Sequence, residues 1–151
     1  MTNKSKTKGS KFEHDAVNIL NSSIDGAHFR RIPGSGAIGT SLGESLLTGD
    51  ISGSVDNFPK KFKVECKAGY NSSSNKEVKQ FTLKKEWLDK IWSEAQDVYA
   101  LPILIGKFDN VHSGTKEFVV MDIDIFSEII NRYTLLQKEL IKRDDEQKGK
   151  Q

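Results

Sequence analysis

The chain has 151 residues, a length that fits one domain with a substantial core, and its single cysteine excludes an intrachain disulfide framework. Hydrophobic residues make up 36% and charged residues 29% of it, and the formal net charge of +2 is too small to identify a partner. No apolar run is long enough to cross a membrane, and no apolar signal segment opens the chain, so we expect a cytoplasmic protein with no membrane partner.

The N-terminus is basic and polar. Residues 1–9 are expected to form a flexible arm, and the stretch up to residue 11 has no acidic residue but contains Lys4, Lys6, Lys8 and Lys11. Two interpretations are equally good: a solubilising terminus, or a tail that binds nucleic-acid phosphates through its charge.

A helix is predicted from Ser10 to about Asn21, because apolar residues recur there at helical spacing. Ser10 and Glu13 fit a capping box, in which the Glu13 side chain reaches back to the backbone of Ser10. The alternative is that Glu13 faces a cleft shared with other carboxylates.

A short strand over residues 27–32 ends in Arg30 and Arg31, and a Gly/Ser-rich loop containing Ser35 follows. The loop matches the spacing of a dinucleotide-binding motif, but no helix opens after it and the chain lacks repeated βαβ units, which argues against that site. Such a loop between arginines can still hold a phosphate.

The stretch from Gly49 to Lys67 predicts a two-stranded hairpin. A turn sequence, Asp-Asn-Phe-Pro at 56–59, separates residues 50–55 from residues 61–68, where polar and apolar residues alternate without a break. Residues two apart on a strand share a face, so Glu65 and Lys67 lie side by side, with Asp50 on the neighbouring strand. Two carboxylates at these positions are suitable ligands for Mg²⁺, and an adjacent ammonium can hold a metal-bound water that attacks phosphorus. The plainer alternative is a solvated strand face with an ordinary ion pair.

The second half of the chain predicts four further elements. These are a helix capped by Thr82, a buried strand over residues 98–108, a strand over residues 117–121, and a helix that starts at Asp122 or Asp124. Near the first of these helices, Lys79 and Lys84 are either solvated or part of a phosphate-binding surface. The domain is expected to span residues 10–141, with a charged, disordered tail over residues 142–151.

This order, with Glu13 on the first helix, Asp50 on the second strand and Glu65-Cys66-Lys67 on the third, resembles the PD-(D/E)XK nuclease superfamily. Within it the chain is most similar to the archaeal-type Holliday junction resolvases, which also occur in viruses; the similar segments are 8–13, 31–36 and 102–108. The resemblance implies an α/β, restriction-endonuclease-like α-β-β-β-α-β core, with a mixed central sheet flanked by helices. The C-terminal helix has no counterpart in that pattern, the link 36–49 is long, and Gly49 stands where the superfamily has proline.

The resemblance also implies a Mg²⁺-dependent DNA endonuclease for which Mn²⁺ is expected to substitute. Its catalytic set would be Glu13, Ser35, Asp50, Glu65 and Lys67, of which the Asp and the two Glu would bind the metal. Lys4, Lys6, Lys8, Lys11, Arg30, Arg31, Lys79 and Lys84 would contact DNA. Like the resolvases, the protein would be a homodimer that makes paired nicks in four-way junctions, as a prokaryotic protein or a viral one acting in the host cell.

Two other functions remain open at this stage. One is a nuclease of the same superfamily with another DNA substrate, such as a restriction-like, repair or nicking enzyme. The other is a non-catalytic nucleic-acid-binding module that kept the fold, which would bind DNA without metal-dependent cutting.

Overall fold

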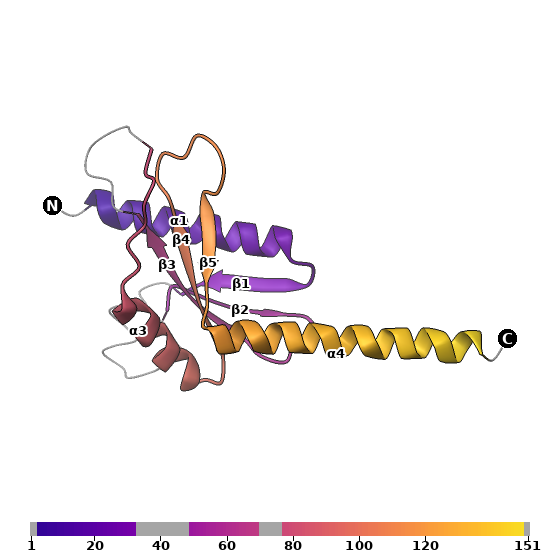
Figure 1. The fold of residues 1–151 in the computed structure, drawn as a ribbon. Coiled ribbons are helices and arrows are strands. Elements are labelled where there is room, and N and C mark those ends of the chain that lie inside the picture. The colour runs from indigo at the N-terminus through magenta and orange to yellow at the C-terminus, as the bar shows by residue number, and fades with distance from the viewer. Residues whose placement is uncertain (1–2, 33–48, 70–76, 150–151) are drawn as a thin grey trace. The chain divides into compact units, whose positions relative to one another are not determined.

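The computed structural model describes residues 3–32, 49–69 and 77–149, with side chains described from Lys8 onward. Figure 1 shows the elements in the order that the sequence predicts, namely α1 (Asn3–Ser23), β1 (Ala27–Arg31), β2 (Ile51–Val55), β3 (Phe62–Ala68), α3 (Lys85–Gln96), β4 (Leu101–Lys107), β5 (Glu117–Val120) and α4 (Ile123–Lys148). The chain forms two compact units, Met1–Val120 and Met121–Gln151, which are described in turn.

The first unit is built on a five-stranded mixed sheet of order β1-β2-β3-β4-β5. The β3–β4 pair is parallel, and the other three pairs are antiparallel. The predicted hairpin is confirmed: β2 and β3 pair with Ile51 opposite Val64, and the Phe58 N–H donates to the Val55 carbonyl at 3.0 Å in the turn. The parallel pair needs a crossover connection, which α3 supplies.

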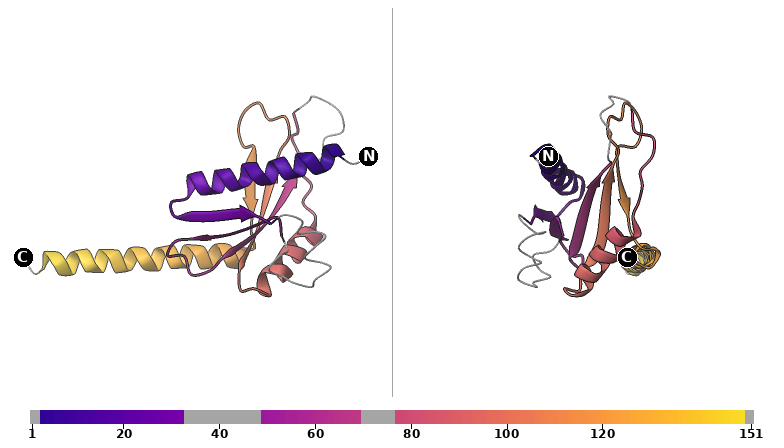
Figure 2. Two further views of the ribbon diagram at one scale, coloured as in Figure 1. Left: turned by 180° about the vertical axis from the view of Figure 1, so that it is seen from behind. Right: turned by 90° about the vertical axis from the view of Figure 1, so that its left-hand side faces the viewer.

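Helices cover both faces of this sheet. α1 packs against β1 and β3, whereas α3 packs against β3 and β4, and Figure 2 shows the two helices on opposite sides of the strands. The apolar stripes predicted from helical spacing are buried in part, at Phe12 and Ala16 on α1 and at Ile91 and Ala95 on α3. Two residues of these stripes, Ile19 and Leu83, are exposed instead. These observations confirm the α/β class and its α-β-β-β-α-β core.

Two glycines in the sheet make room for phenylalanine rings on the neighbouring strand. Gly53 pairs with Phe29, and a Cβ added at Gly53 would lie 2.2 Å from the Phe29 ring. Gly106 pairs with Phe118 in the same way, again with a 2.2 Å approach. Each ring therefore covers the backbone opposite it, and neither glycine can carry a side chain without displacing an aromatic residue.

The element boundaries differ from expectation at both ends. α1 begins at Asn3 rather than Ser10, so the predicted basic arm is mostly helical, and Lys8 forms an ion pair with the buried Asp109. α4 continues to Lys148 through most of the segment that we expected to be disordered. Both segments contain lysine, a good helix former, and no proline interrupts either one.

The prediction that β3 has one open face is wrong. Its side chains alternate as expected, but Lys63 and Glu65 are only 2% and 4% exposed. β3 is the central strand of the sheet, and α3 packs over the face that carries these charged residues. Similarly, α3 begins at Lys85, and the residue at its N-cap is Lys84 rather than the predicted Thr82.

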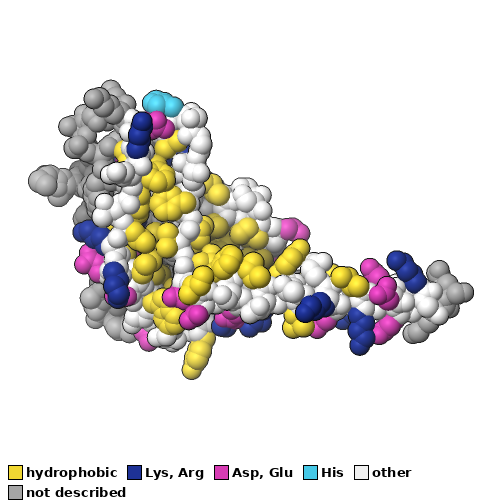
Figure 3. Space-filling model, viewed as in Figure 1, with side chains coloured by type: hydrophobic (Ala, Val, Ile, Leu, Met, Phe, Trp, Pro, Cys, Tyr) yellow, Lys and Arg dark blue, Asp and Glu magenta, His cyan; other side chains and the backbone are white. Residues whose placement is uncertain are grey.

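The second unit is a single helix, α4. Of the two predicted caps, Asp122 and Asp124, it is Asp122 that caps the helix, because its side chain accepts a hydrogen bond from the Asp124 N–H at 2.7 Å. Large apolar side chains are exposed along the helix, and charged ones gather toward its C-terminal end (Figure 3). None of the described helices, α4 included, has the length and apolar character needed to cross a bilayer.

Candidate active site

Asp50 lies directly before β2, where backbone hydrogen bonds fix its position. Its N–H donates to the Val64 carbonyl at 3.0 Å, and its own carbonyl accepts from Ile32 N–H at 2.9 Å. Gly49, just before it, has a φ of +78°, which the proline of the superfamily pattern could not adopt. The Asp50 Oδ2 atom accepts a 2.7 Å hydrogen bond from the Cys66 N–H, which holds the carboxylate against β3.

Glu65 and Lys67 lie side by side on β3, as the period of two predicts. The Lys67 Nζ is 2.6 Å from Glu65 Oε1, and the Glu65 side chain is only 6% exposed. The second oxygen, Glu65 Oε2, is buried and has no hydrogen-bond partner among the described atoms. A buried carboxylate oxygen without a partner is costly, so this atom is a candidate ligand for a cation.

The electrostatics of the pair also favour a cation. Burial raises the pKa of Asp50 from 3.8 to about 6; the negative charges of Glu65 and, more weakly, Glu13 act in the same direction. The Cys66 N–H and Lys67 offset part of this rise. The half-buried Asp50, just before β2, and the buried Glu65 on β3, which has one oxygen without a partner among the described atoms, fit the hard, all-oxygen coordination of Mg²⁺.

Glu13 is engaged elsewhere. Arg31 donates from Nε and Nη2 to Glu13 Oε2, at 2.8 and 2.6 Å, and from Nη2 to Ser10 Oγ at 2.8 Å. The predicted capping box is therefore wrong: both of its residues lie inside α1 and bind a side chain from β1. Among the described residues, no three His, Cys, Asp or Glu side chains are grouped to hold a metal ion, and the Glu13 carboxylate is bound by Arg31.

Trp87 was missed as a site residue, because a tryptophan on an apolar helix stripe is normally read as core. The Lys67 Nζ lies 5.2 Å from the centre of its ring, and Lys84 Nζ lies 5.6 Å from it. The ring is held by an edge contact with Phe81 at 6.4 Å. Trp87 on α3 therefore helps to fix the ammonium of Lys67 on β3.

The predicted DNA contacts are distributed unevenly. Ser35 lies outside the described residues, as do the side chains of Lys4 and Lys6. Lys8 is exposed but bound to Asp109, and Arg31 is half-buried and bound to Glu13. The other exposed side chains of this set are Lys11, Arg30, Lys79 and Lys84.

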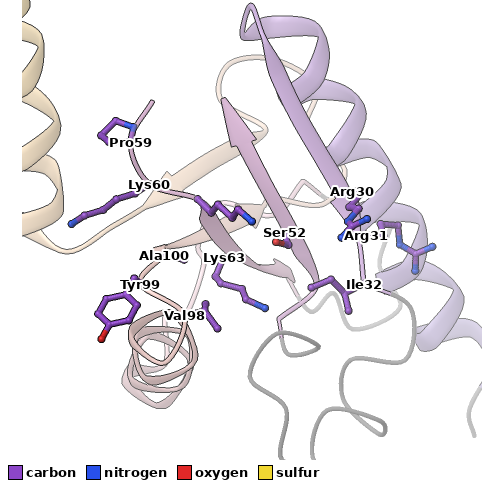
Figure 4. Close-up of a pocket in the computed structure, with 11 residues that line it drawn as sticks. Arg30, Arg31, Ile32, Ser52, Pro59, Lys60, Lys63, Val98, Tyr99 and Ala100 are labelled. Atoms are coloured by element: carbon purple, nitrogen blue, oxygen red, sulfur yellow. The ribbon is translucent and has the colours of Figure 1, made fainter. Parts of the chain in front are cut away.

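A basic pocket of about 630 Å³ is lined by Ser52 and Lys63, each two residues along the chain from Asp50 or Glu65 (Figure 4). The cationic residues on its wall come from β1 and from the start of β3: Arg30, Arg31, Lys60, Lys61 and Lys63. Burial lowers the pKa of Lys63, and the nearby Glu94 opposes this effect. In the sequence, the run of lysines after Pro59 was the one sign of this pocket. That these lysines lie near Arg30 follows only from how the strands pair.

Comparison with known proteins identifies a family. No curated protein matches the chain. Among solved structures, the chain is similar to Archaeoglobus fulgidus Hjc, a Holliday junction resolvase, with a TM-score of 0.48 and 16% identity over 74% of this chain and 73% of that one. The family model described as "Phage putative PDDEXK endonuclease" matches residues 4–151, nearly the whole sequence. The chain therefore belongs to this phage PD-(D/E)XK endonuclease family, and it is a nuclease by family.

Proposed function

We propose that this protein is a Mg²⁺-dependent, structure-selective DNA endonuclease that makes paired nicks in four-way junctions. The observation that carries the proposal is the pair of Asp50 and the buried Glu65, in which Glu65 has one oxygen bound to Lys67 and the other without a hydrogen-bond partner among the described residues. The sequence resemblance to the archaeal-type resolvases supports the choice of junctions.

Asp50 and Glu65 would hold the Mg²⁺, with Glu13 as an outer ligand once Arg31 releases it. The bound metal would supply Lewis-acid stabilisation of the phosphodiester and lower the pKa of a coordinated water. The Lys67 ammonium, held by Glu65 and by the Trp87 ring, would orient the attacking water and offset the charge that develops on the phosphate oxygens. Ser35, Arg30 and the N-terminal lysines would hold the DNA backbone.

Two symmetric nicks require two active sites, so the active form would be a homodimer, working in the cytoplasm of the host cell. α4 offers a candidate interface because its apolar residues recur in steps of three and four, at Ile123, Phe126, Ile130, Tyr133, Leu136 and Leu140. Sedimentation should give a dimer for the wild type and a monomer for Ile130→Glu. A dimer that survives this substitution would move the interface to α3, the other candidate.

The decisive experiment is cleavage of a labelled four-way junction beside linear duplex of the same sequence, with Mg²⁺ and with EDTA. The wild type is expected to nick the junction in pairs only with Mg²⁺, and Glu65→Gln to be inactive. Glu146→Gln, which removes an exposed carboxylate on α4, is the matched control and should cut normally.

The same assay separates the alternatives. Metal-dependent cutting of both DNAs would keep the nuclease and reject the junction preference. Tight binding without cutting would leave a DNA-binding module and reject catalysis.

A further inference from the structure

Tyr99 ends the connection from α3 in an unusual backbone conformation. Its N–H donates to the Gln96 carbonyl at 3.2 Å, and the Ala100 N–H donates to the Ala95 carbonyl at 2.9 Å. This pair of bonds is a Schellman motif with Tyr99 at the position that glycine normally fills, and its φ is +54°. The other described non-glycine residues with positive φ, Asn57 and Asn110, are of the type that tolerates it.

Packing does not compensate for this conformation. The Tyr99 side chain is 88% exposed, the largest fraction among the described large hydrophobic residues. A left-handed backbone costs an ordinary residue about 1–2 kcal/mol, and a buried ring would offset that cost, but an exposed one does not. A tyrosine that costs stability and adds no packing is a candidate for binding.

The ring stands beside the basic pocket that adjoins the active site. Arg30, Ser52 and Lys63 form one row across β1, β2 and β3, because Arg30 pairs with Ser52 and Ser52 pairs with Lys63. No acidic residue is among the described residues that line the pocket. In Figure 4, Tyr99 and Lys60 lie on one side of it, and Arg30 and Ser52 lie across from them.

The pocket and the carboxylates share one face of the sheet. Lys63 and Glu65 are two residues apart on β3, which places them on the same face, separated by about 6.6 Å along the strand. A strand of DNA at the carboxylates would therefore continue over Lys60, Lys61 and Arg30, whereas Lys63 is only 2% exposed and does not reach it. Its phosphates would be neutralised there, and its bases would reach the exposed ring.

We propose that this pocket binds the backbone of a DNA strand next to the cleavage site, and that Tyr99 stacks on an unpaired base of that strand. The inference rests on the proposed nuclease function and narrows its substrate class to DNA with unpaired bases at or beside the branch. A base inside an intact duplex has both faces covered by its neighbours, whereas an unpaired base can stack on an aromatic side chain.

The test measures binding rather than cutting, in EDTA and in the Glu65→Gln background. Branched DNA with unpaired nucleotides is compared with linear duplex, and 2-aminopurine is placed at successive unpaired positions. Tyr99→Gly is expected to weaken binding of the branched DNA roughly 5- to 150-fold, to leave duplex binding unchanged, and to abolish the 2-aminopurine quenching. Tyr99→Phe keeps the ring and is the matched control, which should retain both signals.

Two further measurements separate binding from structure and charge from stacking. Thermal unfolding of Tyr99→Gly should show no loss of stability, because glycine suits the left-handed position. Lys61→Gln and Arg30→Gln should each weaken binding to both DNAs and lower the slope of log K against log salt by about one. Lys142→Gln on α4 is the charge control and should leave that slope unchanged.

Each outcome decides the inference. Equal binding of branched DNA by the wild type and Tyr99→Gly would overturn the stacking role, as would a Tyr99→Phe variant as weak as Tyr99→Gly. Unchanged salt slopes for Lys61→Gln and Arg30→Gln would overturn the backbone site. In all these cases the proposed function still stands if the wild type cuts DNA, whereas a wild type that neither binds nor cuts DNA would remove both.

Discussion

Replacing Asp50 by Asn removes a charge that the fold disfavours, because burial and Glu65 raise the pKa of this carboxyl. The substitution preserves size, and the Asn Oδ1 atom can still accept the hydrogen bond that Cys66 N–H makes to Asp50 at 2.7 Å. In wild-type protein without metal, the carboxylate is buried beside Glu65, and these two effects raise its pKa to about 6. We therefore expect Asp50→Asn to stabilise the metal-free fold at neutral pH.

The direction with pH follows from linkage. The folded protein holds the Asp50 proton up to about pH 6, whereas the unfolded chain releases it near 3.8, so folding becomes less favourable as pH rises between these values. The loss of folding stability caused by the charged Asp50 is small below pH 4 and reaches its full size above pH 7. A difference of this size corresponds to about 3 kcal/mol, an upper estimate that would raise Tm by roughly 6–12 °C for a chain of this length.

The assay is urea unfolding of wild type and Asp50→Asn in EDTA, at matched pH values from 4.5 to 8. Subtracting the free energies of unfolding of the two proteins at each pH cancels the contributions of the other titrating groups. The extra stability of the variant should grow with pH and then level off. Added Mg²⁺ should stabilise the wild type and have little effect on the variant. A variant that is less stable than wild type at pH 8 in EDTA would refute the electrostatic reasoning, and equal stabilisation by Mg²⁺ would remove Asp50 from the metal ligands.

Three further predictions concern the surroundings of the site. Gly53→Ala places a methyl group 2.2 Å from the Phe29 ring, and we expect it to cost about 1–3 kcal/mol in urea unfolding; an unchanged midpoint would mean that the ring moves freely. Trp87→Leu removes the ring that lies 5.2 Å from Lys67 Nζ, so kcat should fall by several fold with KM little changed, and Trp87→Phe should recover part of the loss; equal kcat for all three would exclude a positioning role. Burial, with the negative charges of Asp50, Glu13 and Glu65, raises the pKa of the Cys66 thiol, so a thiol reagent at pH 8 should label it only after unfolding; rapid labelling of the folded protein would contradict this.

Local patterns in the sequence were sufficient for the element order and the central hairpin. The alternation over residues 61–68 and the turn at 56–59 act between near neighbours, so they correctly bring Asp50 and Glu65 onto adjacent strands. The cap at Asp122 is equally local. The same reasoning failed for the capping box at Ser10, because it needs a helix start there, and the helix had already begun at Asn3.

What the sequence could not predict depends on contacts between distant elements. Whether Glu65 is exposed depends on its strand being central and on α3 covering it, and a period of two is the same in either case. The binding of Glu13 by Arg31 joins α1 to β1, and the approach of Trp87 to Lys67 joins α3 to β3. The spacing of residues along the sequence does not reveal any of these contacts, because they depend on how the helices and strands pack in three dimensions.

The hairpin that unites Asp50 with Glu65 also makes the site divisible. Its turn lies at the protein surface, with Asp56 and Asn57 both exposed, and it is the one covalent link between β2 and β3. A chain opened there would give two fragments: α1, β1, β2 and Asp50 in one, and β3 with Glu65 and Lys67 in the other. Neither fragment alone would contain both carboxylates, so cutting activity would report their reassembly, as in a split-enzyme sensor of proximity.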